Sequence, residues 1–213
     1  MVSNNHTPDG PRKEFLLRMY DQLFNEINTH ILVVWQSIGV LVSTIAVYAL
    51  VEKSILNIDI ANSIIVLICG WLLAHVIDAG YWYNRNLAII SNIEKLFLTE
   101  GDLRDVHYYF GKHRPDNKML THLLIQMIFS NVILFFVIGI QIFNRLIPAL
   151  QNKTFTSLML LPLLLFIALC VILARENILN NEKYQEFLIN SPGIPINTDG
   201  INYGKGHGFR KNH

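Results

Sequence analysis

Charged residues are scarce in this chain of 213 residues: Asp, Glu, Lys and Arg make up 15% of it, against 52% hydrophobic residues. A mean hydropathy of +0.34 is too high for an ordinary soluble domain. The chain also lacks an excess of charge of either sign, because its formal net charge is +1. No direct binding of nucleic acid is therefore expected.

Cysteine is rare as well, with two residues in the chain. Cys69 and Cys170 fall in different apolar segments, at depths that differ by roughly 10 Å for a rise of about 1.5 Å per residue, so we expect no disulfide. No spacing of His, Cys, Asp and Glu matches a metal site. No Ser/His/Asp or Cys/His arrangement indicates a nucleophile. We expect a non-enzymatic protein without a metal or a cofactor.

Long apolar segments are what the sequence has instead, and each is long enough to cross a bilayer as a helix. These segments cover residues 31–50, 61–83, 119–143 and 155–174. The predicted fold class is therefore an all-α integral membrane protein, a four-helix bundle over residues 14–190 whose helices extend into the cytosol. The polar residues 1–13 predict a disordered arm, and the glycine-rich residues 191–213 predict a flexible tail.

The second apolar segment organises the chain, because its pattern predicts one helix over residues 60–98. After the aromatic residues 81–83, apolar residues recur at helical spacing at Leu87, Ile90, Ile93 and Phe97. A similar stripe precedes the first span, at Phe15, Met19, Leu23 and Ile27. We expect the two stripes to pack together. The alternative is that the first stripe lies on the membrane surface.

Two prolines mark expected irregularities. Pro148 should limit the turn after the third span, since proline cannot continue a helix without losing a hydrogen bond. Pro162 lies inside the fourth span and predicts a kink there.

The distribution of basic residues predicts the orientation. If both termini lie inside, all but three of the 17 Lys and Arg residues fall on the inner side, and the three exceptions are Lys53, Arg145 and Lys153. Basic residues are enriched on the cytoplasmic side of membrane proteins. We therefore expect a multi-pass protein of the bacterial inner (plasma) membrane with cytosolic N and C termini.

Several polar residues lie inside the predicted spans, in what we expect to be an intramembrane polar layer in the inner leaflet. They are Gln36, His75, Asp78, His122, Gln126, Ser130 and Asn131. One interpretation is structural, in which these groups form hydrogen bonds across helices and set the register. The other is a proton or ion path, since an intramembrane carboxylate is costly and is often functional. Small residues four apart predict close helix packing at Gly39 and Ser43 and at Gly70 and Ala74.

Four spans with helical cytosolic extensions, together with one short run, suggest a known group of proteins. The run is Trp82 to Leu87, which leads into Ser91 to Lys95. With this run and its four spans, the chain resembles small bacterial multi-span membrane effectors of anti-phage defence systems. That resemblance covers the architecture and this run. It implies oligomerisation and loss of inner-membrane integrity when a sensor partner is triggered. The catalytic partner of such systems is not part of this chain.

Three functions are compatible with these observations. The leading hypothesis is a self-associating, pore-forming or membrane-perturbing effector under a cytosolic trigger. The second is a small transporter or an ion- or proton-conducting protein that uses His75 and Asp78. The third is a membrane anchor or scaffold for a cytosolic partner. The expected partners are the lipid bilayer, further copies of the chain, and a cytosolic protein or nucleoprotein.

Overall fold

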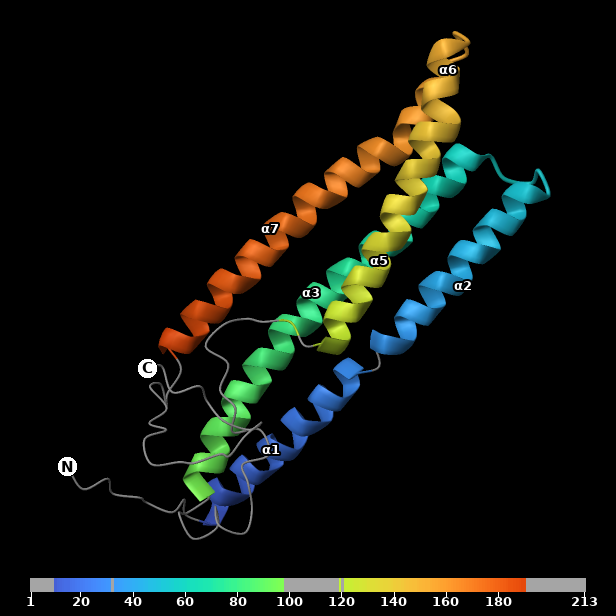
Figure 1. The fold of residues 1–213 in the computed structure, drawn as a ribbon. Helices are drawn as coiled ribbons and strands as arrows, with labels where there is room; N and C mark the ends of the chain where they lie inside the picture. Colours follow the sequence, from blue (N-terminus) through green and yellow to red (C-terminus); the bar gives the residue numbers. More distant parts are fainter. Residues whose placement is uncertain (1–9, 32, 98–118, 120, 191–213) are drawn as a thin grey trace. The chain divides into compact units, whose positions relative to one another are not determined.

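The computed structural model describes residues 10–31, 33–97, 119 and 121–190 (Figure 1). All regular structure within these ranges is helical: α1 (Gly10–Ile31), α2 (Val33–Glu52), α3 (Ile58–Phe97), α5 (Thr121–Ile140), the π-helix η1 (Gln141–Leu146), α6 (Ile147–Gln151), the 3₁₀-helix η2 (Ser157–Leu160) and α7 (Leu161–Asn190). Four helical stretches are long and apolar enough to cross a membrane: Trp35–Glu52, Ile58–Glu94, Thr121–Gln151 and Ser157–Asn190. The predicted all-α fold class is confirmed, and the chain has the make-up of a multi-span membrane protein.

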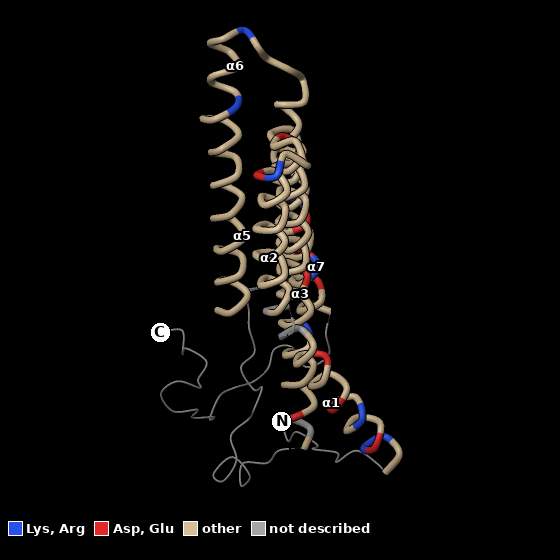
Figure 2. Tube along the Cα trace, turned by 90° about the vertical axis from the view of Figure 1, so that its right-hand side faces the viewer, with Lys and Arg blue, Asp and Glu red and all other residues tan. Residues whose placement is uncertain are grey.

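Charged residues divide unevenly among these helices (Figure 2). No charged residue occurs in α5, and α2 contains one, Glu52, at its last position. By contrast, α1 carries basic and acidic residues along its length, such as Arg12, Arg18 and Glu26. Helix α1 is therefore a polar, amphipathic helix and does not belong to the candidate spans.

The chain forms two compact units, each of which is described by itself. The described part of the first unit comprises α1, α3 from Tyr81 onward and the end of α7 from Asn181. The second comprises α2, α3 up to Gly80, the stretch from α5 to α6, and α7 up to Asn180.

Helix α3 is central to the second unit. It lies between α2 and α7, and α5 packs on one side of this row (Figures 1 and 2). In the most apolar segment of α3, 56% of the residues are buried. The corresponding shares are 17% for α2, 33% for the stretch Thr121–Gln151 and 11% for the stretch Ser157–Asn190. The buried α3 residues Ile65, Cys69, Leu72 and Val76 recur every three or four positions and pack with Leu123 and Leu134 of α5. The other helices turn most of their apolar surface outward, as helices that face lipid do.

Residues of α1 and α3 form the core of the first unit. Leu23 and Ile27 of α1 pack with Leu87, Ile90 and Ile93 of α3, which confirms that the two stripes meet. Phe15 is an exception, because its side chain is 65% exposed.

Polar contacts and α7 complete the first unit. The Asn86 side-chain amide donates a hydrogen bond to Glu26 at 3.1 Å, and the Tyr20 hydroxyl donates one to Glu94 at 3.3 Å. On the α7 side, the fully buried Tyr184 packs with Ala88 of α3. The C-terminal half of α3 therefore contacts both α1 and α7.

Both expectations about proline require correction. The helix does not end before Pro148, because α6 continues to Gln151. At the end of η1 the backbone N–H of Ile147 donates to the carbonyl oxygen of Ile142, five residues earlier. The backbone hydrogen bonds therefore change from the α-helical to the π-helical pattern just before Pro148, which has no N–H to donate. Pro162 lies within the candidate span Ser157–Asn190, but it is the second residue of α7, where a missing N–H costs nothing.

The predicted N-terminal arm is also too long. Residues 10–13 belong to α1, and Pro11 lies in its first turn, a favourable position for proline. Residues 1–9 and the predicted tail, 191–213, lie outside the described residues.

Candidate functional site

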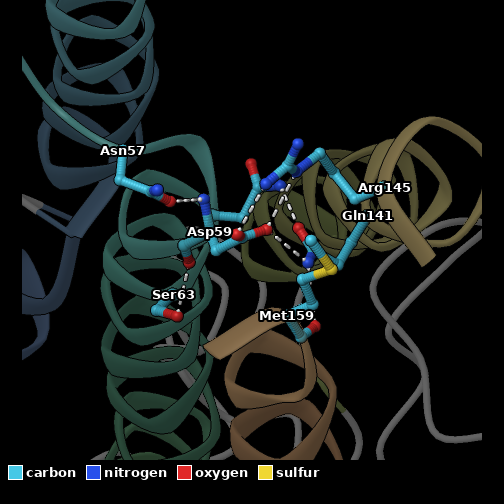
Figure 3. A network of polar contacts seen from close by, with 7 residues as sticks. Asn57, Asp59, Ser63, Gln141, Arg145 and Met159 are labelled. Carbon is cyan, nitrogen blue, oxygen red and sulfur yellow. Dashed lines mark hydrogen bonds and ion pairs between the residues drawn. The ribbon is translucent and has the colours of Figure 1, made fainter. Parts of the chain in front are cut away.

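A buried polar network begins at the first turn of α3 (Figure 3). Asn57 immediately precedes the helix, and its side-chain oxygen accepts a hydrogen bond from the backbone N–H of Asp59 at 2.7 Å. This contact is an N-cap, which satisfies a backbone donor that has no partner within the helix. The Ser63 hydroxyl donates to the Asp59 carbonyl oxygen at 2.8 Å. Asp59 is thereby fixed at the positive end of the helix dipole.

The Asp59 carboxylate is the centre of this network. Arg145 donates to both of its oxygens, from Nε to Oδ1 at 3.2 Å and from Nη2 to Oδ2 at 2.9 Å. Gln141 donates a third hydrogen bond to Oδ1 at 2.8 Å. Asp59 is 1% exposed, so its charge is compensated as a buried carboxylate requires.

The π-helix η1 supplies both donors, since Gln141 and Arg145 lie four residues apart within it. The Gln141 amide nitrogen also donates to the carbonyl oxygen of Met159 in η2 at 2.8 Å. Its oxygen accepts a hydrogen bond from Asn62 at 2.6 Å, and Asn62 accepts one from the Tyr48 hydroxyl of α2 at 2.9 Å. The network thus connects α2, α3, η1 and η2. Because its polar groups are paired with one another, we interpret the network as structural: it holds these four elements together.

The residues predicted to form a polar layer on α5 differ in burial, and none of them is fully exposed. Gln126 and Ser130 lie on the buried face of α5, and the Ser130 hydroxyl donates to the carbonyl oxygen of Cys69 at 3.2 Å. His122 is half-buried, and Asn131, also half-buried, donates to the carbonyl oxygen of Met127 in its own helix at 2.8 Å.

Two glutamines have buried atoms with unused hydrogen-bonding capacity. Gln126 is 4% exposed, and neither its amide nitrogen nor its amide oxygen has a partner among the described residues. The side-chain oxygen of Gln36 on α2 is likewise buried, with no partner in the described part of the chain. Such groups are rare in native proteins, because each one forfeits the hydrogen bonds that it made with water.

His75 and Asp78 lie on the outside of α3, apart from the buried face of α5. Both are exposed, and the His75 ring packs edge-on against Trp71, with ring centroids 4.5 Å apart. Leu67 and Trp71 on the same side of the helix are 54% and 50% exposed. We call this surface the α3 polar face: it consists of Leu67, Trp71, Ala74, His75 and Asp78, which helical spacing brings onto one side.

The small residues predicted to mediate packing occupy different environments. A Cβ atom at Gly70 would overlap the side chain of Leu169, so α3 and α7 approach closely there. Nothing lies within 4 Å of a Cβ atom built at Gly39 on α2. Ser43 is half-buried, and Ala74 is exposed on the α3 polar face.

Sequence reasoning missed the network at Asp59. The available signal was an Asn57 cap followed by a carboxylate, and one arginine, Arg145, at the matching end of another apolar segment.

The α3 polar face is the candidate functional surface, because it places two ionisable side chains on the exposed side of a membrane-spanning stretch. Within the described ranges, no group of three or more His, Cys, Asp and Glu residues is placed to hold a metal ion. No family model matches the chain, and neither the curated proteins nor the solved structures include a significant match to it.

Proposed function

We propose that the protein is a non-enzymatic, self-associating effector of the bacterial inner membrane, whose assembly perturbs the bilayer or forms a pore in it. Its termini lie in the cytosol, and a cytosolic protein or nucleoprotein triggers the assembly. The observation that carries this proposal is the exposure of His75 and Asp78 on the α3 polar face.

Self-association follows from the cost of placing these groups in lipid. An acidic or basic side chain costs about 2.5–3.5 kcal/mol at the centre of a spanning helix and less toward its end, and such residues normally face a bundle interior or a water-filled cavity. The α7 and α5 helices of the same chain leave His75 and Asp78 uncovered. Further copies of the chain can cover them, and His75 of one copy can then pair with Asp78 of the next.

Membrane perturbation follows from the chemistry of such an assembly. Several α3 polar faces turned toward a common axis would line that axis with imidazole and carboxylate groups. Rings of charged side chains are one of the linings that ion channels use. The remaining exposed residues of α2, α5 and α7 are mostly apolar and suit contact with lipid.

A proton- or ion-conducting transporter is the second candidate, favoured by the position of His75 and Asp78 one turn apart on α3. In that case each chain conducts by itself, and conduction depends on a substrate gradient. The effector instead requires assembly before any current flows. A membrane anchor would give no current in either state.

Depolarisation of cells that overexpress the chain separates these functions. We expect the wild-type chain to collapse the membrane potential and Asp78→Leu to abolish the collapse, because leucine removes the polar lining. Asp78→Asn and His75→Gln keep a polar group and should retain part of the activity. Glu52→Gln, at the exposed end of α2, is the matched control. Substrate-coupled flux without collapse would favour the transporter, and wild-type activity in Asp78→Leu would contradict the effector proposal.

A further inference from the structure

An open groove of about 600 Å³ lies in the first unit between α3 and the end of α7. Its lining includes Tyr81, Trp82 and Arg85 from α3, and Lys183, Glu186 and Phe187 from α7. No residue of the α3 polar face lines this groove, and the groove plays no part in the proposed pore. It combines cationic and aromatic side chains at one place, which calls for a ligand that has both a charge and an apolar part.

Arg85 is held in the groove by two aromatic rings. Its guanidinium carbon lies 4.8 Å from the centroid of the Trp82 ring and 5.6 Å from that of the Phe187 ring. A cation–π contact of this kind engages the positive charge of the guanidinium and pairs none of its N–H groups with an acceptor atom. No hydrogen bond or ion pair joins Arg85 to another described residue. The N–H groups of the Arg85 guanidinium are therefore available to bind an oxyanion.

The charges in the groove match a singly charged anion. Lys183 supplies a second cation from the exposed side of α7, and Glu186 supplies one carboxylate. The groove therefore has a net charge of one positive unit when all three groups are ionised. A phosphodiester carries one negative charge, and its two free oxygens fit the bidentate geometry of an arginine.

The position of the groove along the chain indicates where this phosphodiester comes from. Tyr81 and Trp82 follow directly after the apolar half of α3, as aromatic residues do where a spanning helix reaches the headgroups. Basic pockets next to the cytoplasmic ends of spanning helices bind anionic lipid headgroups. We propose that this groove binds the headgroup of an anionic phospholipid, with its phosphodiester held by Arg85 and Lys183.

Titration of the purified full-length protein with lipid, followed by native mass spectrometry, tests this site. We expect phosphatidylglycerol to bind more tightly than phosphatidylethanolamine with the same acyl chains, because the second lipid has no net charge. Arg85→Gln and Lys183→Gln should each weaken phosphatidylglycerol binding about fivefold. Arg85→Lys should weaken it too, because lysine keeps the positive charge but cannot donate two parallel hydrogen bonds to a phosphate as the guanidinium does. Arg175→Gln removes an exposed charge from α7 outside the groove and should have no effect.

The exposed side chain of Lys183 keeps the test independent of folding, since it makes no hydrogen bond or ion pair with another described residue. Equal affinity for the two lipids would overturn the proposal. So would unchanged phosphatidylglycerol binding in Lys183→Gln and Arg85→Gln. Binding of inorganic phosphate to the groove without any preference for phosphatidylglycerol would assign the site to free phosphate and would also overturn it.

Discussion

Arg145 donates two hydrogen bonds to the carboxylate of Asp59, a residue 86 positions away in the sequence. The Asp59 side chain is 1% exposed and the Arg145 side chain 32% exposed, so the arginine brings the compensating charge to a carboxylate that water does not reach. This ion pair, together with Gln141, fastens the beginning of α3 to the π-helix η1. The second unit is thereby held at the end where α2 and α3 are connected.

We predict that Arg145→Gln lowers the free energy of unfolding in detergent by about 3 kcal/mol, because it leaves a buried carboxylate without its charged partner. The double variant with Asp59→Asn should recover much of this loss, since no buried charge then remains. Lys153→Gln, which removes an exposed basic residue, is the control. Strictly additive effects of Asp59→Asn and Arg145→Gln in the double-mutant cycle would show that the two residues are not coupled.

Gly70 and Gly39 provide a second comparison. Gly70→Ala places a Cβ atom against Leu169 and should lower stability by about 1–3 kcal/mol through overpacking. Gly39→Ala meets nothing within 4 Å and should leave stability unchanged or raise it by up to about 1 kcal/mol, since alanine favours the helix. Thermal unfolding of the two variants in one detergent measures the difference. Equal behaviour of the two alanines would contradict the close approach of α3 and α7.

Gln126 and Ser130, one turn apart on the buried face of α5, should respond in opposite directions. Gln126→Met replaces an amide without a described partner by an apolar side chain of similar size, and we expect it to be stabilising by about 1 kcal/mol. Ser130→Ala removes the hydrogen bond to Cys69 and should be destabilising by about 1 kcal/mol. Denaturation in detergent gives both values. A marked loss of stability in Gln126→Met would mean that the amide is bonded in the membrane.

Local patterns in the sequence predicted much of the fold. The helical spacing of Leu87, Ile90 and Ile93 and of Leu23 and Ile27 indicated which faces are buried, and these faces meet in the first unit. Apolar length indicated the four candidate spans. The positions of Pro148 and Pro162 were misread, because the effect of a proline depends on whether it falls inside a helix or in its first turn.

The candidate sites were harder to predict, because they depend on which helices become neighbours. Spacing placed His75 and Asp78 on one side of α3, but periodicity alone does not tell whether another helix covers that side. Likewise, no local pattern connects Asp59 to Arg145. Asp59 and Arg145 pair because η1 packs against the first turn of α3, and no pattern in the sequence indicates this packing.

The proposed orientation is tested with reporter fusions. We predict that reporters placed after Lys13, within residues 99–118 and after His213 all give a cytosolic signal, because all but three of the 17 Lys and Arg residues would then lie inside. A reporter in the connection around Lys53 should give a periplasmic signal and serves as the control. A periplasmic signal from any of the first three positions is incompatible with four spans and cytosolic termini.

Cross-linking between copies in native membranes tests self-association through the α3 polar face most directly. In a Cys170→Ser background, Ala74→Cys places a thiol on the α3 polar face, and Val171→Cys places one on an exposed apolar position of α7. If copies assemble through α3, oxidation should convert the Ala74→Cys protein to covalent dimers and leave the Val171→Cys protein monomeric. Dimers from Val171→Cys alone, or no dimers from Ala74→Cys while the protein is in the membrane, would contradict assembly through this face.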